Sequence, residues 1–570
     1  MGLVTVGCAT TNAVVQPPQA VSGSEHMVAT SNASASSAAL EVLRAGGSAV
    51  DAAIAAQLVL TVTEPDASGL GGGALLVYYD PATKGVTVFD GREVAPRGAS
   101  PVILRDARGR RVPRLSVVAS GRSVAVPGVL RMLELAHQRH GRLPWARLFQ
   151  PAIALADGGF RVTARLYSQL AVTPHVDLYA EARALFFHDG LPRPVGSELT
   201  HPKLAETLRT LATEGARAFY EGPIARDVVA AVSSTRPLKG ALSEDDLRSY
   251  AAVEREALCG QYHGRRICGS PPPSLGTVTL LEALGILEHF DLGSGAGWTL
   301  ARAHLLAEAL RLAFADGRTY VADPAFAPTR VEGLLLPDYL AARAKLVDPT
   351  RATRKRARPG RPASTVSTLS ATPDVHEDPY DGPPSTSHLV IRDRTGAVVS
   401  MTSSLGGHFG SRLMVRGFFL NNHVTDFSPE PMLRGQLRGN RLEPGKRPRT
   451  AMTPLIVLDA EGRVELALGS AGSAQIVPHV AKVLMGVLDW GLDVQSAIEL
   501  PNVVNTNGPT RVEVVPGSQR ACERLAERLR RRGHRIGPLL RDSGIQAIHM
   551  TPTGLEGGAD SRRGGLVLAD

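Results

Sequence analysis

The sequence is poor in the features that usually mark a metal site, a membrane span or a nucleic-acid interface. It has four cysteines, with no CxxC pair and no cluster with histidine, so a zinc site has little support. No run approaches the roughly 18 apolar residues that span a bilayer. Lysine is scarce, since only 7 of the 63 basic residues are Lys and the other 56 are Arg. Apart from residues 351–362, these arginines are spread along the chain without interleaved aromatic residues, which does not indicate nucleic-acid binding.

Two further common signatures are missing or incomplete. The GxSxG elbow of Ser-His-Asp hydrolases does not occur in the chain. Gly69, Gly71 and Ala74 match GxGxxA, but a predicted helix precedes them and a β-rich run follows, the reverse of the dinucleotide-binding order. We therefore expect a glycine-rich turn that leads into a central strand, and no cofactor or metal.

The cysteines and the first residues bear on the cellular compartment. Cys259 and Cys268 flank a predicted hairpin, ALCGQYHGRRICG, and could face each other, although we expect two free core thiols. The start, MGLVTVGCATTNAVVQPPQAV, lacks a charged n-region and an adequate apolar stretch, so the signal peptide looks incomplete. GCATT followed by a Pro/Gln/Val-rich linker still resembles the mature start of a bacterial lipoprotein. We expect residues 1–25 to be an export or linker segment of a bacterial protein that is periplasmic or lipid-anchored through Cys8.

The rest of the chain changes character once. Residues 27–64 have the pattern of two helices, and residues 128–345 are mostly helical in pattern. Residues 349–385 are rich in Pro, Ser, Thr and Arg with almost no large apolar residue, which predicts a flexible tether. An alternating β pattern then begins abruptly at Thr386, and further strands follow it.

A threonine in that position could become a catalytic nucleophile if the chain were cut directly before it. A hydroxyl is a poor nucleophile without a base, and in the intact chain the Thr386 nitrogen is an amide with no basicity. A cut between Ser385 and Thr386 would turn this nitrogen into an α-amine with a pKa of about 8, within reach of the residue's own hydroxyl. A single cleavage would therefore create a nucleophile and its base together.

The surrounding stretches resemble a known family. STSHLVIRDRTGAVVSMTSS, GFFLNNHVTDFS, PGKRPRTAMTPLIVLDAEG and LGSAGSAQI are similar to the small subunit of γ-glutamyltranspeptidases, and FDGREVAP, HGRLPWARLFQPAIALADGGF and SPPPSLG are similar to the large one. The resemblance covers about residues 26 to 565 without the tether. It implies an N-terminal nucleophile hydrolase of the α+β class, a four-layer αββα sandwich made as a self-cleaving proenzyme. Residues 26–385 would form the large subunit and residues 386–570 the small subunit, which stay associated as one domain.

The resemblance also implies the activity and the residues that perform it. Thr386 would take the γ-glutamyl group from glutathione or a related amide and pass it to water, an amino acid or a peptide. Ser404 would hydrogen-bond Thr386, and the backbone N–H groups of Gly472 and Ser473 would hold the oxyanion. Ser473 stands where the family has a glycine, so a positive φ there would cost energy. Arg92 would bind the substrate's α-carboxylate and Asp426 its ammonium group, while His388 is expected to be structural.

Four pocket positions depart from the family pattern. Gly406 stands where an Asn is usual, His423 replaces a Gln, and Thr450 and Ala451 replace a Ser-Ser pair that binds the α-carboxylate. Each lost hydrogen bond to a charged group costs about 1.5–3 kcal/mol. The stretch that follows Asp426 is also short and has no Tyr to close over the site. We therefore expect an open pocket and more hydrolysis than transfer.

Two alternatives stay open. The same mechanism could serve a glutaryl (cephalosporin) acylase, although a glutaryl group has no ammonium and so gives Asp426 no role. The chain could also be an uncleaved, inactive binding relative, although Thr386, Ser404 and Arg92 are all retained.

Overall fold

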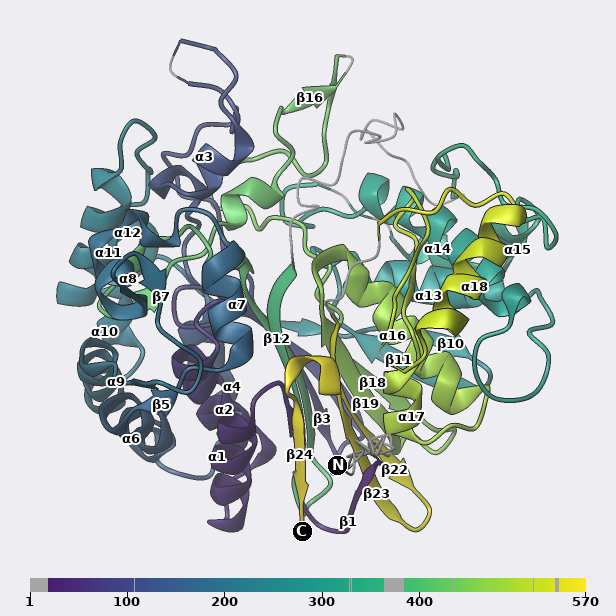
Figure 1. Cartoon of the computed structure of the whole chain (residues 1–570), viewed down its shortest axis with the longest axis horizontal. Helices are drawn as coiled ribbons and strands as arrows, with labels where there is room; N and C mark the ends of the chain where they lie inside the picture. Colours follow the sequence, from purple (N-terminus) through teal and green to yellow (C-terminus); the bar gives the residue numbers. More distant parts are fainter. Residues whose placement is uncertain are drawn as a thin grey trace, which may run out of the picture.

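The computed structural model describes residues 19–106, 108–327, 329, 331–362, 384–433, 435–515, 517–538 and 543–570. Two seven-stranded sheets lie at its centre, and helices cover the outer face of each (Figure 1). Neighbouring strands in both sheets are antiparallel. This arrangement confirms the predicted αββα sandwich of the α+β class.

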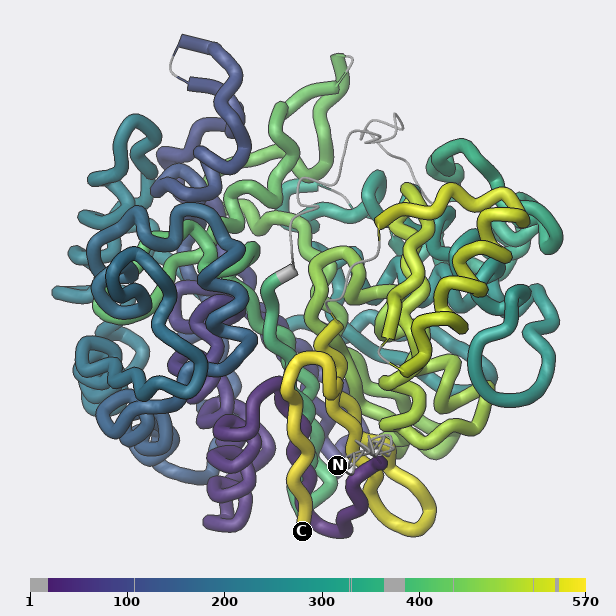
Figure 2. Tube along the Cα trace, in the orientation of Figure 1, coloured from purple at the N-terminus to yellow at the C-terminus, as the bar shows by residue number. Residues whose placement is uncertain are grey.

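The first sheet carries the start of the predicted small subunit in its middle. Its order is β24 (Leu566–Ala569), β2 (Met27–Thr30), β12 (Pro384–Arg392), β13 (Val398–Gly407), β3 (Gly73–Asp80), β4 (Gly85–Gly91) and β9 (Val253–Glu256). Strands β2 and β24, from the two ends of the chain, lie side by side (Figure 2). Strand β12 therefore pairs with an early strand on one side and with β13 on the other.

The second sheet also combines early and late segments. Its order is β1 (Val21–Gly23), β23 (Gly554–Ala559), β22 (Gly544–Thr551), β19 (Val464–Ala471), β18 (Leu455–Leu458), β11 (Arg265–Gly269) and β10 (Leu258–Tyr262). The register of β10 and β11 places Cys259 directly opposite Cys268, and the two form a disulfide. The expectation of two free thiols there is wrong, because this register brings their Cα atoms within 4.1 Å.

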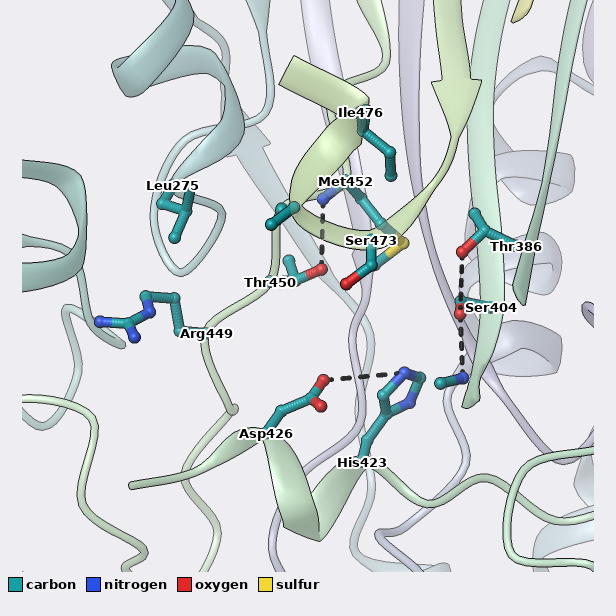
Figure 3. A pocket seen from close by; sticks show the side chains of 13 residues that line it. Leu275, Thr386, Ser404, His423, Asp426, Arg449, Thr450, Met452, Ser473 and Ile476 are labelled. Atoms are coloured by element: carbon teal, nitrogen blue, oxygen red, sulfur yellow. Dashed lines mark hydrogen bonds and ion pairs between the residues drawn. The ribbon is translucent and has the colours of Figure 1, made fainter. Parts of the chain in front are cut away.

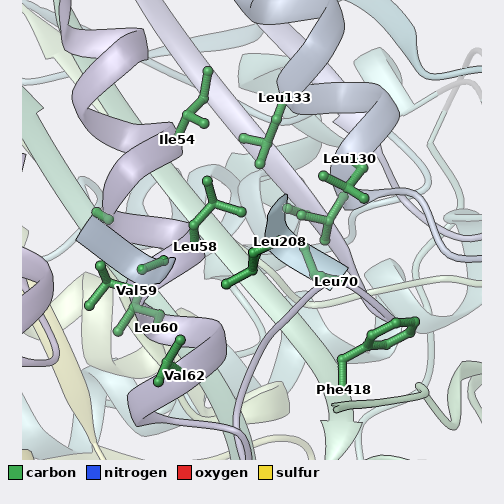
Figure 4. Packing of buried hydrophobic residues seen from close by; sticks show 14 of the residues in the cluster. Ile54, Leu58, Val59, Leu60, Val62, Leu70, Leu130, Leu133, Leu208 and Phe418 are labelled. Carbon is green, nitrogen blue, oxygen red and sulfur yellow. The ribbon is translucent and has the colours of Figure 1, made fainter. Parts of the chain in front are cut away.

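Apolar side chains fill the space between the sheets and beneath the helices. Between the sheets, Val390 of β12 belongs to the same buried cluster as Ile456 and Ala467 of the second sheet. Beneath the helices on the first sheet, a larger cluster includes Leu58, Leu130 and Leu208 (Figure 4). These come from three of the helices on that side, which are α1 (Ala33–Arg44), α2 (Ala49–Thr63), α4 (Val129–His140), α6 (Gln150–Gly158) and α9 (Pro202–Glu214).

The sequence explains where helix α2 begins and why it lies in the core. Ser48 and Asp51 form a capping box, each accepting a hydrogen bond from the other's backbone N–H. Every residue of α2 is buried, as expected for a helix that is apolar all round. The helix ends just before the loop that leads to the glycine-rich turn.

The outer face of the second sheet is covered by α13 (Gly276–Leu287), α14 (Leu300–Tyr320), α16 (Ile476–Leu488) and α17 (Val494–Glu499). The remaining helices are α3 (Arg114–Val118), α5 (Trp145–Leu148), α7 (Ala164–Val172), α8 (Ala180–Phe186), α10 (Arg217–Tyr220), α11 (Pro223–Ser234), α12 (Glu244–Arg248), α15 (Pro337–Ala344) and α18 (Gln519–Arg531). Short pairs are β5 (Phe160–Arg161) with β8 (Glu198–Leu199), β6 (Phe187–His188) with β7 (Leu191–Pro192), β14 (Met414–Val415) with β15 (Phe418–Phe419), β16 (Met432–Leu433) with β17 (Gln436–Leu437), and β20 (Val503–Val504) with β21 (Arg511–Val512).

The glycine-rich stretch is a turn into a central strand, as predicted. It leads from α2 into β3, and β3 lies between β13 and β4. A Cβ atom on Gly72 would lie 2.3 Å from Ser404 O, and one on Gly73 would lie 2.3 Å from Glu93 Oε2. The glycines thus let this turn pass directly behind the strands that carry the predicted site.

Residues 349–362, the first part of the predicted tether, are packed on the molecule without helix or strand. Ala352 and Ala357 are buried. The Ala352 N–H donates to Arg532 O at 2.9 Å, and the Ala357 N–H donates to Asn507 Oδ1 at 2.7 Å. Small apolar side chains and backbone hydrogen bonds thus anchor this part of the segment at Ala352 and Ala357, and the flexibility of the tether stays a prediction.

Residues 363–383, the rest of that predicted tether, and residues 1–18 with Cys8 lie outside the described residues. Within the described ranges, no helix combines the length and the apolar character needed to cross a membrane. The same ranges contain no group of three His, Cys, Asp or Glu residues placed to hold a metal ion.

Candidate active site

Thr386 lies at the start of β12, where the pairing with β13 is irregular. Ser385 pairs with Gly406 and Ser387 with Ser403, so two residues of β13, Ser404 and Leu405, lie opposite Thr386. The extra residue is therefore on β13, and a bulge of this kind bends the strand that carries it. The Thr386 side chain opposite the bulge lines the pocket of Figure 3.

The Thr386 hydroxyl lies against the carbonyl of the preceding residue. Its Oγ1 is 2.5 Å from Ser385 O and 3.2 Å from Ser404 Oγ. Ser404 Oγ donates to the same Ser385 oxygen at 2.9 Å and accepts from the Gly406 N–H at 2.9 Å. The predicted pair of Thr386 and Ser404 is therefore brought together around the bond that the sequence marks for cleavage.

Neighbouring residues hold Thr386 from both sides. Ser385 Oγ donates to Asp66 O, and Ser387 Oγ donates to Glu64 Oε2 at 2.7 Å. Both acceptor residues are buried in the loop that follows α2. The backbone on either side of the nucleophile is thus fixed to the large first part of the chain.

His388 lies between the two sheets, away from the pocket. Its ring contacts Gly469 of the facing sheet, where a Cβ atom would lie 2.2 Å from His388 Cε1. Nδ1 lies 2.9 Å from Thr402 Oγ1. Burial lowers the pKa of His388 to about 3, so the ring is neutral at physiological pH. Its position is that of a packing residue, as expected.

The predicted oxyanion donors occupy a strained turn after β19. Gly472 has φ 136° and Ser473 has φ 53°, so the serine adopts the left-handed region that favours glycine. Ser473 lines the same pocket as Thr386. Among the described residues, neither the Gly472 nor the Ser473 backbone N–H has a hydrogen-bond acceptor. Two backbone donors are therefore available beside the nucleophile.

A buried ionic cluster lies at the other side of the pocket. Arg92 is fully buried, and its Nη2 lies 2.5 Å from Asp426 Oδ2 while its Nη1 lies 3.1 Å from Glu93 Oε2. His423 Nδ1 lies 2.6 Å from Glu93 Oε1, and its Nε2 lies 3.8 Å from Asp426 Oδ2. Asp426 and His423 line the pocket, whereas Arg92 lies behind them and reaches it only through Asp426.

The remaining predicted residues lie where the sequence suggested, in the wall of this pocket. Gly406 has φ 100°, and a Cβ atom there would lie 1.9 Å from Asn422 Oδ1, so no larger residue fits this backbone. Thr450 Oγ1 accepts from the Met452 N–H at 3.3 Å and Ala451 lies beside it. The hydroxyl of Thr450 is thus the polar group that remains from the usual serine pair.

The pocket has a volume of about 70 Å³ and brings together eight of the ten predicted site residues. It also contains lining residues that the sequence analysis missed: Leu275, Arg449, Met452, Ala474 and Ile476. Arg449 lies on the opposite side from Thr386 (Figure 3) and donates through Nη1 to Arg318 O at 2.5 Å. The sequence did offer a signal for Arg449, because it directly precedes Thr450 and adjacent residues of a pocket loop can both approach the ligand.

The stretch after Asp426 forms a short hairpin at the upper edge of the molecule rather than a cover. Strands β16 and β17 project from the body of the fold (Figure 1). The hairpin base is tied to the first part of the chain, since Ile103 N donates to Pro429 O at 3.3 Å and Arg105 pairs with Glu430 at 3.0 Å. No residue of the hairpin lines the pocket among the described residues. This geometry fits the expectation of an open site.

Comparisons with known proteins agree with this geometry. The family model described as Gamma-glutamyltranspeptidase matches residues 35–569. The glutathione hydrolase proenzyme of Bacillus subtilis is 34% identical over 554 residues, covering 96% of this chain and 92% of that protein. The acylase ACY 1 proenzyme of a Pseudomonas species is also 34% identical, covering 96% and 94%. The crystal structure of cephalosporin acylase from Bacillus halodurans superposes with a TM-score of 0.84 at 28% identity and covers 99% of both chains.

Proposed function

The chain belongs to the gamma-glutamyltranspeptidase family and is a glutathione hydrolase and γ-glutamyltransferase, and on that premise we propose that Thr386 is its nucleophile. The observation that carries this assignment is the position of Thr386 Oγ1, 2.5 Å from the carbonyl oxygen of Ser385. The hydroxyl that must attack and the carbonyl that must be attacked are already in contact in the intact chain. Ser404 bonds to both of them.

The first step of the proposal is cleavage of the chain by its own threonine. Thr386 Oγ attacks the Ser385 carbonyl carbon, the C–N bond to Thr386 breaks, and the hydroxyl proton passes to the departing nitrogen. The product is an ester between Ser385 and Thr386 Oγ, beside a free α-amine. Water then hydrolyses the ester, which leaves a carboxylate on Ser385 and restores the hydroxyl of Thr386.

The second step uses the new α-amine as the base. The amine accepts the Thr386 hydroxyl proton while Oγ attacks the γ-carbonyl of the donor, and the oxyanion that forms is held by the N–H groups of Gly472 and Ser473. The donor's amine leaves with a proton, and an acyl-enzyme ester remains. Water resolves that ester in hydrolysis, and an amino acid or peptide resolves it in transfer.

Residues in the pocket wall opposite Thr386 bind the γ-glutamyl end of the substrate. Asp426 offers its carboxylate to the substrate ammonium, and Thr450 offers its hydroxyl to the α-carboxylate. Arg92 supports Asp426 from behind. Gly406 and Ala451 supply no side-chain hydrogen bond, and His423 takes the place of the amide, so the glutamyl end has fewer polar contacts than the family pattern provides.

A glutaryl acylase is the alternative substrate class, and one observation favours it. The relatives include acylases as similar to this chain as the glutathione hydrolases are. The retained Asp426 favours the γ-glutamyl group, because a glutaryl group has no ammonium to pair with a carboxylate.

Export is part of the same proposal. Disulfides persist in oxidising compartments and are rare in the reducing cytosol. The bridge between Cys259 and Cys268 therefore supports an exported protein.

The proposal is tested by the denatured mass and N-terminal sequence of the purified protein beside its Thr386→Ala variant. We expect two fragments from the wild type, the smaller beginning at Thr386, and one intact chain from the variant. A Thr386→Ser variant, which keeps a hydroxyl, serves as the control and should still cut. A single uncut wild-type chain with native-like circular dichroism would overturn the assignment, since the base would never form.

A further inference from the structure

A second polar cavity lies where residues 353–356 cross the C-terminal part of the chain, and Thr386 is not among its lining residues. Its volume is about 50 Å³. A water molecule needs roughly 10–15 Å³ of such space, so the cavity can hold several waters or one small polyatomic ion. Its walls come from α14, from residues 353–356, from residues 505–510 and from residues 534–535.

The neutral polar groups in this region are satisfied by one another. Asn505 Nδ2 donates to Thr510 Oγ1 at 3.0 Å, and Thr510 Oγ1 lies 2.9 Å from His534 Nδ1. His534 Nε2 lies 2.8 Å from His304 Nδ1, and His304 Nε2 lies 2.8 Å from the carbonyl oxygen of Asp348.

The donor and acceptor of each of these hydrogen bonds follow from the last acceptor in the series, the carbonyl oxygen of Asp348. A carbonyl only accepts, so His304 Nε2 carries a proton and His304 Nδ1 accepts from His534 Nε2. His534 Nδ1 then accepts from the Thr510 hydroxyl. Burial lowers the pKa of both imidazoles, which keeps them neutral. The two imidazoles and the Thr510 hydroxyl therefore have no N–H or O–H left to offer a ligand.

Cationic side chains outnumber carboxylates in the wall. The cavity is lined by one carboxylate, Glu308, and by five cationic side chains: Arg311, Arg354, Lys355, Arg356 and Arg535. Within the described residues, Arg354, Lys355 and Arg535 form no ion pair. All three side chains are exposed, so water screens part of their mutual repulsion, and an anion among them would reduce the rest.

Arg311 is the buried centre of this group. Only 6% of its side chain is exposed, and its Nε and Nη2 both donate to Glu308 Oε2, at 3.2 and 2.9 Å. Its Nη1 has no acceptor among the described residues. A buried guanidinium whose outer nitrogen is unused at the wall of a cavity is a preformed donor for an anion.

We propose that this cavity binds an inorganic tetrahedral oxyanion such as phosphate, held by Arg311 with Lys355 and Arg535. The volume limits the ligand to a small ion, and a lining of five cationic side chains with one carboxylate favours a multivalent anion. Arg311 and Lys355 precede the Ser385–Thr386 bond in the chain, whereas Arg535 follows it. The anion therefore ties residues 353–356 to the C-terminal part, and this link joins two separate polypeptides once the chain is cut.

The test is calorimetric titration of inorganic phosphate into the purified full-length protein, at constant ionic strength with chloride as the competing anion. We expect one saturable site. The double variant Lys355→Gln/Arg535→Gln leaves the Glu308–Arg311 pair intact and should bind phosphate at least ten-fold more weakly. The control Arg524→Gln/Arg528→Gln removes the same charge from exposed positions of α18 and should bind as the wild type does.

Three results would overturn the proposal. These are no saturable binding in the wild type, unchanged affinity in the Lys355→Gln/Arg535→Gln variant, or an equal loss in the control variant. The melting temperatures of the variants without phosphate separate a folding defect from a lost site, since a folded double variant that no longer gains stability from phosphate supports the site. None of these outcomes depends on the catalytic proposal, because Thr386→Ala protein can be titrated in the same way.

Discussion

Removal of the Asp426 carboxylate should separate γ-glutamyl from glutaryl substrates. Asp426 Oδ2 is held by Arg92 Nη2, and 22% of its side chain is exposed, which leaves the carboxylate open to the pocket. In Asp426→Ala the substrate ammonium loses its ionic partner. Arg92 keeps its contact with Glu93 Oε2 at 3.1 Å, so the buried guanidinium stays paired and the fold should survive.

The size of the effect follows from the lost hydrogen bond. A hydrogen bond to a charged group contributes about 1.5–3 kcal/mol, which corresponds to a loss of about 10- to 150-fold in kcat/KM for a γ-glutamyl anilide. The partial exposure of Asp426 places the expectation in the lower half of that range. A glutaryl anilide has no ammonium, and the substitution also uncovers Arg92, so its cleavage should be unchanged or faster.

The assay compares kcat/KM for the two anilides in the wild type, Asp426→Ala and Asp426→Asn. Asparagine keeps the shape and one acceptor oxygen but removes the charge, so it should fall between the other two on the γ-glutamyl substrate. Thermal melting of the three proteins checks that the fold is intact. An equal loss of kcat/KM on both anilides would refute the reasoning, since Asp426 would then support the pocket structure rather than bind the substrate ammonium.

Two further outcomes follow from the backbone and from the buried histidines, both measured on the uncut Thr386→Ala protein, whose unfolding is unimolecular. Ser473→Gly should raise the free energy of unfolding in urea by about 0.5 kcal/mol. The reason is that relief of the left-handed backbone strain exceeds the entropy cost of glycine in the unfolded chain. A decrease in the free energy of unfolding would contradict the φ of 53° at this position. Acid should destabilise the protein as the pH falls from about 6.5 towards 3, by roughly 1.4 kcal/mol per pH unit for each histidine that stays neutral when folded but is protonated when unfolded. Equal urea midpoints at pH 7 and pH 5 would contradict it, given the lowered pKa values of about 4 for His201 and about 3 for His388, His479 and His534.

Much of this architecture could be predicted because local chemistry and tertiary structure agree. Ser48 and Asp51 satisfy the free N–H groups of a helix that is apolar on all sides. The apolar run from Leu389 to Ile391 fits a strand that is buried on both faces, since Leu389 and Ile391 pack in the cluster beneath the helices and Val390 packs in the cluster between the sheets. The pocket residues could be placed because the resemblance supplied their positions, and eight of them do line one cavity.

The missed features depend on strand register, on burial or on contacts between residues far apart in the sequence. The pairing of Cys259 with Cys268 depends on the exact register of two strands, which composition does not reveal. Residues 349–362 look unable to fold because their anchors are small alanines and backbone donors, whose acceptors lie more than a hundred residues away. The burial of Arg92 behind Asp426 is likewise invisible in the sequence, since both residue types suit a surface as well as a pocket.

The strand order of the two sheets has a consequence for the lifetime of the processed protein. In the first sheet, β13 and β24 follow the Ser385–Thr386 bond, β12 contains the bond near its start, and β2, β3, β4 and β9 precede it; the second sheet is mixed in the same way. Neither fragment contains a complete sheet. Folding of the intact chain is unimolecular, but reassembly of two fragments is bimolecular and depends on their concentration. On the proposed cleavage, a molecule that unfolds afterwards would have little chance of recovery, and the active form would persist by slow unfolding rather than by repeated refolding.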